Sequence, residues 1–143
     1  MSTNVPSPRE VVDRFLRASA ANAWDDLADL YAPDAEIEIP FAPEGVPARS
    51  RGREIFRARF KAAAPLRRFD KAAPVVIHET RDPEVVIVEY DLHGSMTKSG
   101  RPFVFSYVMV MRIRDGLIVH SRDYANPLAG AEFRDELAEA IEQ

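Results

Sequence analysis

The stretch at residues 120–127, HSRDYANP, places a carboxylic acid near the end of an otherwise apolar pattern. If these residues form a strand, Asp123 and Arg122 point to opposite faces, so a simple ion pair between them is not expected. Asp123 then shares a face with a less polar set: Leu117, Val119 and Ser121. The opposite face carries the rest: Ile118, His120, Arg122 and Tyr124. A carboxylic acid in an apolar cavity has a raised pKa and can transfer protons near neutral pH. Asp123 is therefore the first candidate for a catalytic acid and base.

A second polar group alternates along residues 85–94: Glu89, Asp91 and His93. Strand alternation puts the three on one face with Val85 and Ile87, and that face is either solvated or part of a site. On the second reading, Asp91 and His93 would assist Asp123 in catalysis. Carboxylate and imidazole groups also bind metal ions, but the sequence offers no fourth ligand that could be placed beside them. No metal is expected.

Other charged residues fit ordinary surface positions. Glu36 and Glu38 alternate with isoleucines, which is typical of a strand with one solvated face. His78 and His120 are expected to be surface or core histidines.

Residues 49–71 hold nine basic side chains and two acidic ones. Arg53, Arg57 and Lys61 are four residues apart and would lie on one helix face. We expect this segment to be a solvated helix whose positive charge is balanced by acidic residues elsewhere in the chain. The alternative is attraction of an anionic substrate or an acidic partner.

Size and composition limit the class of protein. The chain has 143 residues, which suits one domain, residues 1–143, with a substantial core. Its formal net charge of −4 and its lack of interleaved basic and aromatic residues do not favour nucleic-acid binding. It has no cysteine, so disulfides and thiolate chemistry are excluded. Neither a signal peptide nor a membrane span is predicted, and we expect a cytoplasmic protein.

The first third of the chain predicts helices. Ser7, Pro8 and Glu10 form a capping box at the start of a helix that continues to about residue 19. Asn22 is expected to cap a second, short helix that ends before Pro33. The apolar residues of that helix are Trp24, Leu27, Leu30 and Tyr31.

The rest predicts mainly strands. The expected strands are residues 35–40, 69–79, 85–94, 103–114 and 117–124, with a loop at 41–50. Helices are expected at 53–63 and at 131–141. Asp115-Gly116 is a strong signal for a two-residue hairpin turn. This order predicts an α+β fold in which a curved sheet wraps around helices.

The strand at residues 103–114 carries apolar side chains on both alternating sets. One set is continuous: Phe103, Phe105, Tyr107, Met109, Met111 and Ile113. The other set holds Val104, Val108 and Val110 together with Ser106. Because a strand with one solvated face should alternate apolar and polar residues, both faces are expected to be covered. In a chain of this length, the second cover would be another subunit.

The ordered segments YAPDAEIEIP, RGREIFRARF, VEYDLHG, RIRDGLI and RDYANPL resemble the nuclear transport factor two-like, or ketosteroid isomerase-like, superfamily. More narrowly, they resemble its SnoaL-like branch of polyketide cyclases, from about Pro8 to Leu128. The resemblance implies a cone-shaped α+β fold, the cystatin-like roll, in which a mixed, mostly antiparallel sheet wraps N-terminal helices around an apolar pocket. It also implies a homodimer that forms through the outer face of the sheet.

Two well-known chemistries of the superfamily match this sequence incompletely. The positions that match the catalytic residues of ketosteroid isomerase hold Phe15, Ile39 and Val110, so that machinery is absent. In the comparison with limonene-epoxide hydrolase, Asp123 and Asp91 match its two acids. Glu89 stands where the bridging arginine belongs.

The SnoaL-like cyclases use one pocket aspartate in the last long strand, and that position matches Asp123. Phenazine-biosynthesis proteins of the A/B type have an acid there too, and they show a run similar to Asp91-Leu92-His93-Gly94. The resemblance implies a cofactor-free lyase or isomerase type of enzyme. It would cyclise, isomerise, hydrate or dehydrate an apolar or aromatic carbonyl compound, with Asp123 as proton shuttle and Asp91 or His93 assisting.

The residues expected to contact the substrate are mainly aromatic or lie near Asp123: Phe15, Trp24, Tyr31, Phe41, Phe56, Phe60, Glu89, Tyr124 and Asn126. Two alternatives remain open. The first is a non-catalytic domain that binds a ligand or a protein partner. The second is epoxide hydrolysis of the limonene-epoxide-hydrolase kind.

Overall fold

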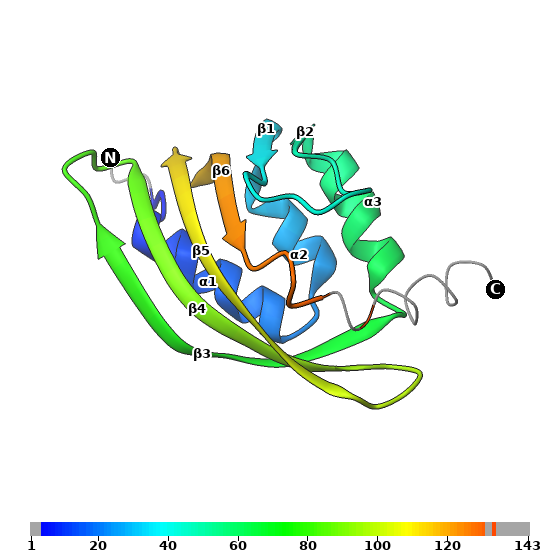
Figure 1. The fold of residues 1–143 in the computed structure, drawn as a ribbon. Helices are drawn as coiled ribbons and strands as arrows, with labels where there is room; N and C mark the ends of the chain where they lie inside the picture. The colour runs from blue at the N-terminus through cyan, green and yellow to red at the C-terminus, as the bar shows by residue number, and fades with distance from the viewer. Residues whose placement is uncertain (1–3, 131–132, 134–143) are drawn as a thin grey trace.

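Helices come first along the chain, and strands dominate its second half (Figure 1). The computed structural model describes residues 4–130 and 133. The elements of this part of the chain are α1 (Pro8–Ala20), α2 (Trp24–Asp29), β1 (Tyr31–Glu38), β2 (Arg49–Arg51), α3 (Arg53–Ala63), β3 (Arg67–Glu79), β4 (Val85–Met96), β5 (Pro102–Arg114) and β6 (Leu117–Ala125).

The strands form a curved sheet in the order β2-β1-β6-β5-β4-β3. β1 and β6 run parallel, and the other neighbours run antiparallel. The three helices lie on the concave side of the sheet (Figure 1). The predicted α+β class, with a mixed and mostly antiparallel sheet around the helices, is confirmed.

The start of α1 is fixed by its capping box. The backbone N–H of Glu10 donates to the Ser7 hydroxyl at 3.2 Å, and the Ser7 N–H donates to the Glu10 carboxylate at 3.4 Å. Pro8 takes the first helical position. The apolar stripe of α1 is buried: Val11, Val12, Phe15 and Leu16. The ring of Phe15 packs edge-on against Tyr90 of β4, with ring centroids 6.3 Å apart.

The predicted cap of α2 is wrong. The N-cap residue is Ala23, which makes no side-chain cap bond. Asn22 instead adopts a left-handed backbone with φ of 56°, which asparagine tolerates better than most residues. Its amide donates to the carbonyl of Phe69 and accepts from the N–H of Phe69, each at 2.9 Å. Asn22 therefore ties the turn between α1 and α2 to β3.

The first strand begins earlier than the sequence indicates. Tyr31, expected at the end of the second helix, opens β1, and Pro33 lies inside that strand instead of stopping a helix. The register against β6 shifts between Tyr31 and Glu36. Proline is tolerated at such an irregularity because the ladder does not need its missing N–H there. The expected loop also contains the short strand β2, Arg49–Arg51, which pairs with β1.

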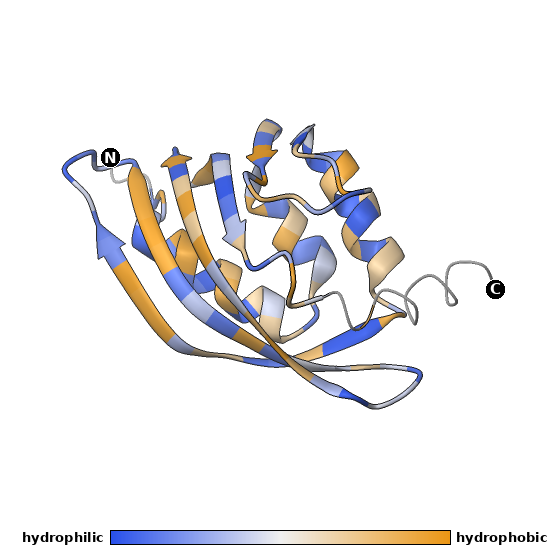
Figure 2. Cartoon of the chain, in the orientation of Figure 1, coloured by the Kyte–Doolittle hydropathy of each residue, from blue (hydrophilic) through white to orange (hydrophobic). Residues whose placement is uncertain are grey.

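We call the side of the sheet that faces the helices the inner face and the other side the outer face. β4 alternates between them, and its buried inner residues are Val86, Val88, Tyr90 and Leu92. β5 buries Met109, Met111 and Ile113 on the inner face, while Val104 and Val108 on the outer face are 50% and 37% exposed. Apolar residues also run along the ends of β3 and β4 that meet at the turn between them (Figure 2).

A register shift changes the predicted alternation of β6. It lies between Arg112 and Ile113 of β5. Ile118 pairs with Ile113 and is fully buried, although strict alternation assigns it to the face of Arg122. Beyond the shift, Ser121 lies opposite Met111 of β5, which is on the inner face. Ser121 is therefore on the inner face as well, as is Ile118 before the shift.

The turn between β5 and β6 follows the sequence signal. Asp115 and Gly116 both have positive φ, 52° and 80°, as the two central residues of a type I′ hairpin turn require. The helix expected at residues 131–141 lies outside the described residues, apart from Phe133. In the described part of the chain, no helix is both long and apolar enough to cross a membrane.

Candidate functional site

A cavity of about 430 Å³ lies between the inner face of the sheet and the helices. Its wall is mainly apolar, with contributions from all three helices and from β3, β4, β5 and β6. The apolar lining includes Leu27, Ile39, Phe60, Phe69, Leu92 and Met109. The charged lining residues are Asp123, Arg59 and Arg67. A mostly apolar cavity of this size with few polar groups suits a small organic molecule.

Asp123 reaches the cavity from β6, where it lies opposite Met109 of β5. The Ser121 hydroxyl, on the same strand face, donates a hydrogen bond to the Asp123 carboxylate. Burial raises the pKa of Asp123 to about 6, while this hydrogen bond and the nearby His120 act in the opposite direction. The side chain is half-buried, as expected for a group that faces a cavity. Its pKa is suited to proton transfer near neutral pH.

Two tyrosines line the cavity beside this acid. Tyr90 of β4 and Tyr107 of β5 stack on one another with ring centroids 5.3 Å apart. Burial raises the pKa of both phenols, and the charge of Asp123 raises them further. Both therefore stay protonated near neutral pH and can donate hydrogen bonds. The Tyr90 hydroxyl points to the Met109 sulfur at 3.7 Å.

The two arginines reach the cavity from different elements. Arg59 extends from α3 and donates a hydrogen bond to the Ser50 hydroxyl. Arg67, at the start of β3, places its guanidinium 5.3 Å from the ring centroid of Phe69 and 6.0 Å from that of Phe105. Neither forms an ion pair with an acid of the described residues.

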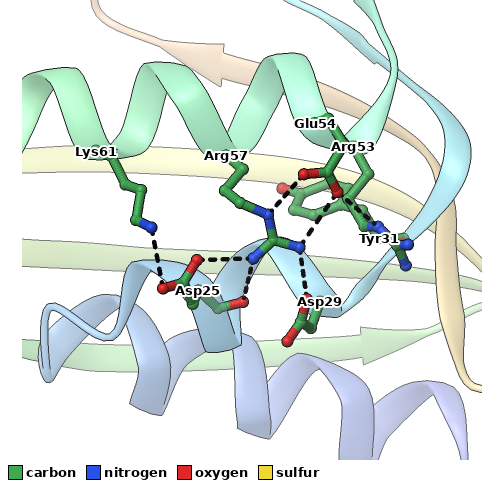
Figure 3. Close-up of polar contacts among 7 residues, drawn as sticks. All are labelled: Asp25, Asp29, Tyr31, Arg53, Glu54, Arg57 and Lys61. Atoms are coloured by element: carbon green, nitrogen blue, oxygen red, sulfur yellow. Dashed lines mark hydrogen bonds and ion pairs between the residues drawn. The ribbon is translucent and has the colours of Figure 1, made fainter.

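Most of the other basic side chains near α3 hold the fold together. Arg57 donates to Asp25 at 2.9 Å, to Asp29 at 2.6 Å and to Glu54 at 3.0 Å (Figure 3). Lys61 pairs with the second oxygen of Asp25 at 3.2 Å. The pairs with Asp25 and Asp29 join α3 to α2, and the pair with Glu54 lies within α3. The positive charges of Arg57 and Lys61 are therefore neutralised by nearby carboxylates.

The sequence candidates separate into four groups. Asp123, Trp24 and Phe60 line the cavity. Phe15, Tyr31 and Phe56 are buried in the core behind it, at 4%, 2% and 1% exposure, and none of them lines it.

The third group lies on the outer face, away from Asp123. Asp91 accepts a hydrogen bond from Ser106 at 2.7 Å, and Glu89 pairs with His78 at 2.6 Å. The Nε2 atom of His93 lies 2.7 Å from the carbonyl oxygen of Ala73. The structure therefore does not bring Asp91 or His93 together with Asp123, because even and odd positions of β4 face opposite sides. The two-acid arrangement of an epoxide hydrolase is likewise not assembled in this chain.

The remaining candidates, Phe41, Tyr124 and Asn126, line a groove of about 480 Å³ along the outer face, together with Asp91 and Glu89. Tyr124 packs edge-on against Phe41, with ring centroids 5.7 Å apart, and Phe41 is 60% exposed. The Asn126 side chain accepts a hydrogen bond from the Leu128 N–H at 2.9 Å. Phe41 and Asn126 also line a further pocket of about 370 Å³, which we call the vestibule. The vestibule shares four lining residues with the cavity: Ile39, Arg67, Tyr107 and Ala125.

Glu36 and Glu38 also face outward. Glu38 lies 3.3 Å from His120 and 3.4 Å from Arg49. Within residues 4–130 and 133, no group of three or more acidic or histidine side chains is placed to hold a metal ion.

Sequence reasoning missed Tyr90, Tyr107 and the two cavity arginines. The signal for Tyr107 was available, because it shares a face with Met109 and the inner face of β5 is continuous. Arg59 and Arg67 were part of the basic segment. The helical spacing places Arg59 on the same face as Phe56 and Phe60, apart from Arg57, and this was a usable signal. Nothing in the sequence separated Arg67 from Arg57.

Comparison with known proteins agrees with this architecture. The family model of the SnoaL-like domain matches residues 12–121. An uncharacterised PhzA/B-like protein of Pseudomonas aeruginosa is 35% identical over 119 residues, which cover 83% of this chain and 82% of that protein.

Solved structures share the fold. A Bacillus subtilis protein described as a "Putative Isomerase" has a TM-score of 0.82 and 29% identity, over 87% of this chain and 90% of that one. An NTF-2 like protein of unknown function from Burkholderia xenovorans has a TM-score of 0.56 and 28% identity, over 83% of this chain and 82% of that one. The chain therefore belongs to the SnoaL-like domain family, within the nuclear transport factor two-like superfamily.

Proposed function

We propose that the protein is a cofactor-free acid/base enzyme that isomerises or cyclises a small apolar or aromatic carbonyl compound. The observation that carries this proposal is the position of Asp123. It is the only carboxylate among the described residues that line the cavity, and burial raises its pKa to about 6. A solved relative at 29% identity that is described as a "Putative Isomerase" adds support.

The chemistry follows from the groups at the wall. The Asp123 carboxylate takes a proton from the carbon next to a carbonyl, and the electrons of that C–H bond form the enolate. A hydroxyl of Tyr107 or Tyr90 donates a hydrogen bond to the enolate oxygen, and the apolar wall excludes water. Return of the proton at a different carbon yields an isomer. Attack of the enolate carbon on a second carbonyl closes a ring, and Asp123 then gives its proton to the new alkoxide.

Proton exchange tests this proposal without knowledge of the substrate. The exchange of the α-protons of 1-tetralone in D₂O, followed by NMR, reports proton abstraction by the protein. Asp123→Asn should abolish the catalysed exchange, and Asp91→Asn, on the outer face, should keep it. Equal rates for wild type and Asp123→Asn would remove the proposed role.

We also propose a homodimer that forms through the outer face of the sheet. Val104 and Val108 of β5 and Val76 of β3 are exposed there, at 50%, 37% and 49%. Exposed valines on two strands of one sheet face are best stabilised by a second apolar surface.

A further inference from the structure

Arg59 and Arg67 differ from the other arginines around α3. Arg57 binds three carboxylates and Lys61 binds one of the same three, whereas neither cavity arginine has a carboxylate partner among the described residues. Each guanidinium has five N–H donors. Arg59 uses a donor on the Ser50 hydroxyl, and Arg67 packs against two aromatic rings. Donors on both side chains therefore remain for an incoming anion.

Arg67 has the more defined position of the two. It is half-buried, and its pairing with Met96 places it on the inner face, while the next residue, Arg68, is exposed. The rings of Phe69 and Phe105 lie near its guanidinium, and such contacts favour a fixed position. It lines both the cavity and the vestibule, together with Tyr107. A ligand that occupies the cavity therefore has one end beside Arg67.

We propose that the substrate is an organic carboxylate, whose apolar body fills the cavity while its carboxylate binds Arg67, with Arg59 assisting. This proposal rests on the proposed function and names the substrate class for the same site. An arginine fork matches a carboxylate through two parallel hydrogen bonds. The last turn of α3, at Phe60 and Ala63, lines the cavity and carries the negative end of the helix dipole. This end opposes a singly charged carboxylate less than a doubly charged phosphate monoester.

The position of Asp123 sets the direction of the ligand. Asp123 and Arg67 do not pair with one another, although both line the cavity. A substrate carboxylate beside Asp123 would be repelled by it, whereas one beside Arg67 is neutralised. The carbonyl group at the other end then lies toward Asp123 and the tyrosines. Arg67 is accordingly a binding and positioning residue.

A matched pair of probes tests this assignment directly. We would titrate the full-length protein at pH 8 with 4-cyclohexylbutyrate and with its uncharged amide, by calorimetry. Neither probe absorbs where tryptophan does, so the fluorescence of Trp24, the single tryptophan and a cavity residue, reports occupancy of the cavity. We expect the acid to bind at least about tenfold more tightly than the amide, because hydrogen bonds to a charged group are the strong ones.

Variants distinguish the effect of the cavity arginines on acid binding from the effect of positive charge on the surface. Arg67→Met should remove most of the tenfold preference, and Arg59→Met together with Arg67→Met should remove all of it. Arg68→Met, the exposed neighbour, should keep it. Equal affinity for acid and amide, the same preference in Arg67→Met, or no binding of either probe at millimolar concentration would overturn the proposal.

The outcome is independent of turnover. Asp123→Asn should keep the preference for the acid, because it leaves both arginines in place and removes only a negative charge that repels the ligand carboxylate. If the preference holds but Asp123→Asn leaves proton exchange unchanged, the carboxylate site stands and the proposed catalytic role fails. If Asp123→Asn abolishes exchange but the preference is absent, the reverse is true.

Discussion

Ser121 donates its hydroxyl hydrogen bond to the carboxylate of Asp123 from the same face of β6, two residues earlier. This relationship holds the acid toward the cavity, and it leaves the second carboxylate oxygen for other partners. Burial nevertheless dominates, and the pKa of Asp123 rises to about 6. A carboxylate in this position is costly to the fold when ionised, and this cost can be measured.

Asp123→Asn should stabilise the protein at alkaline pH. Because its carboxyl pKa is raised from 3.8 to about 6, the folded state keeps a proton that the unfolded state loses between these pH values. The free energy of unfolding therefore falls as pH rises through this window, by about 3 kcal/mol. Urea unfolding should show the Asn variant to be more stable than wild type at pH 8 and nearly equal at pH 4. Asp91→Asn is the control, and a similar gain there would contradict the assignment.

Gly94→Ala should destabilise the fold by about 2–3 kcal/mol, because it overpacks the inner face of β4. A Cβ atom at this position would lie 2.3 Å from the carbonyl oxygen of Arg68 and 2.7 Å from the ring of Phe103. The backbone oxygen cannot move away without separating β3 from β4. Gly130→Ala meets nothing within 4 Å and is the matched control. Equal midpoints of urea unfolding for the two variants would show that the close approach is absent.

Arg57→Gln should lower the thermal midpoint by releasing α2 from α3. Its hydrogen bonds lower the pKa of Asp25 and of Glu54, so these carboxylates stabilise the folded state above their ordinary pKa values and lose this contribution as pH falls. The difference between wild type and variant should therefore be present at pH 7 and shrink toward pH 3. A constant difference across this range, in calorimetric scans, would mean that packing and not charge carries the effect.

Val108→Glu should weaken self-association. Val108 is 37% exposed on the outer face, and a carboxylate there would be buried without a partner in the proposed dimer. Sedimentation velocity at micromolar concentration should show a dimer for wild type and a shift toward monomer for the variant. Ile55→Glu changes an apolar residue on α3 that is 49% exposed, and it should leave the dimer intact. A wild-type protein that is only monomeric under these conditions would end the proposal.

Local patterns predicted much of the fold. The capping box at Ser7, the hairpin at Asp115-Gly116 and the alternation of β4 are each decided by neighbours in sequence, so they were predictable. Asn22 and Pro33 were wrongly interpreted, because a distant strand and a register shift determine what they do. Ile118 was assigned to the wrong face of β6 because one irregularity reverses strand alternation.

In the candidate site, too, local features were predictable and contacts between distant segments were not. Asp123 could be singled out from alternation and from family resemblance. Whether Asp123 lies beside Asp91 and His93 depends on which faces of β4 and β6 point the same way, and the sequence does not give this. In the structure, Asp91 and His93 are on the outer face and Asp123 is on the inner face. Arg67 became distinguishable from Arg57 only when the partners of each were known.

The pH dependence of proton exchange tests whether Asp123 is the proton shuttle. The protein should catalyse exchange of the α-protons of 1-tetralone in D₂O, with a rate that rises with pH and levels off above an apparent pKa near 6. Asp123→Asn should lose this catalysis, and Asp91→Asn should retain both the rate and the profile. Catalysed exchange that persists in Asp123→Asn, with the same profile as wild type, would contradict the assignment of Asp123 as the proton shuttle.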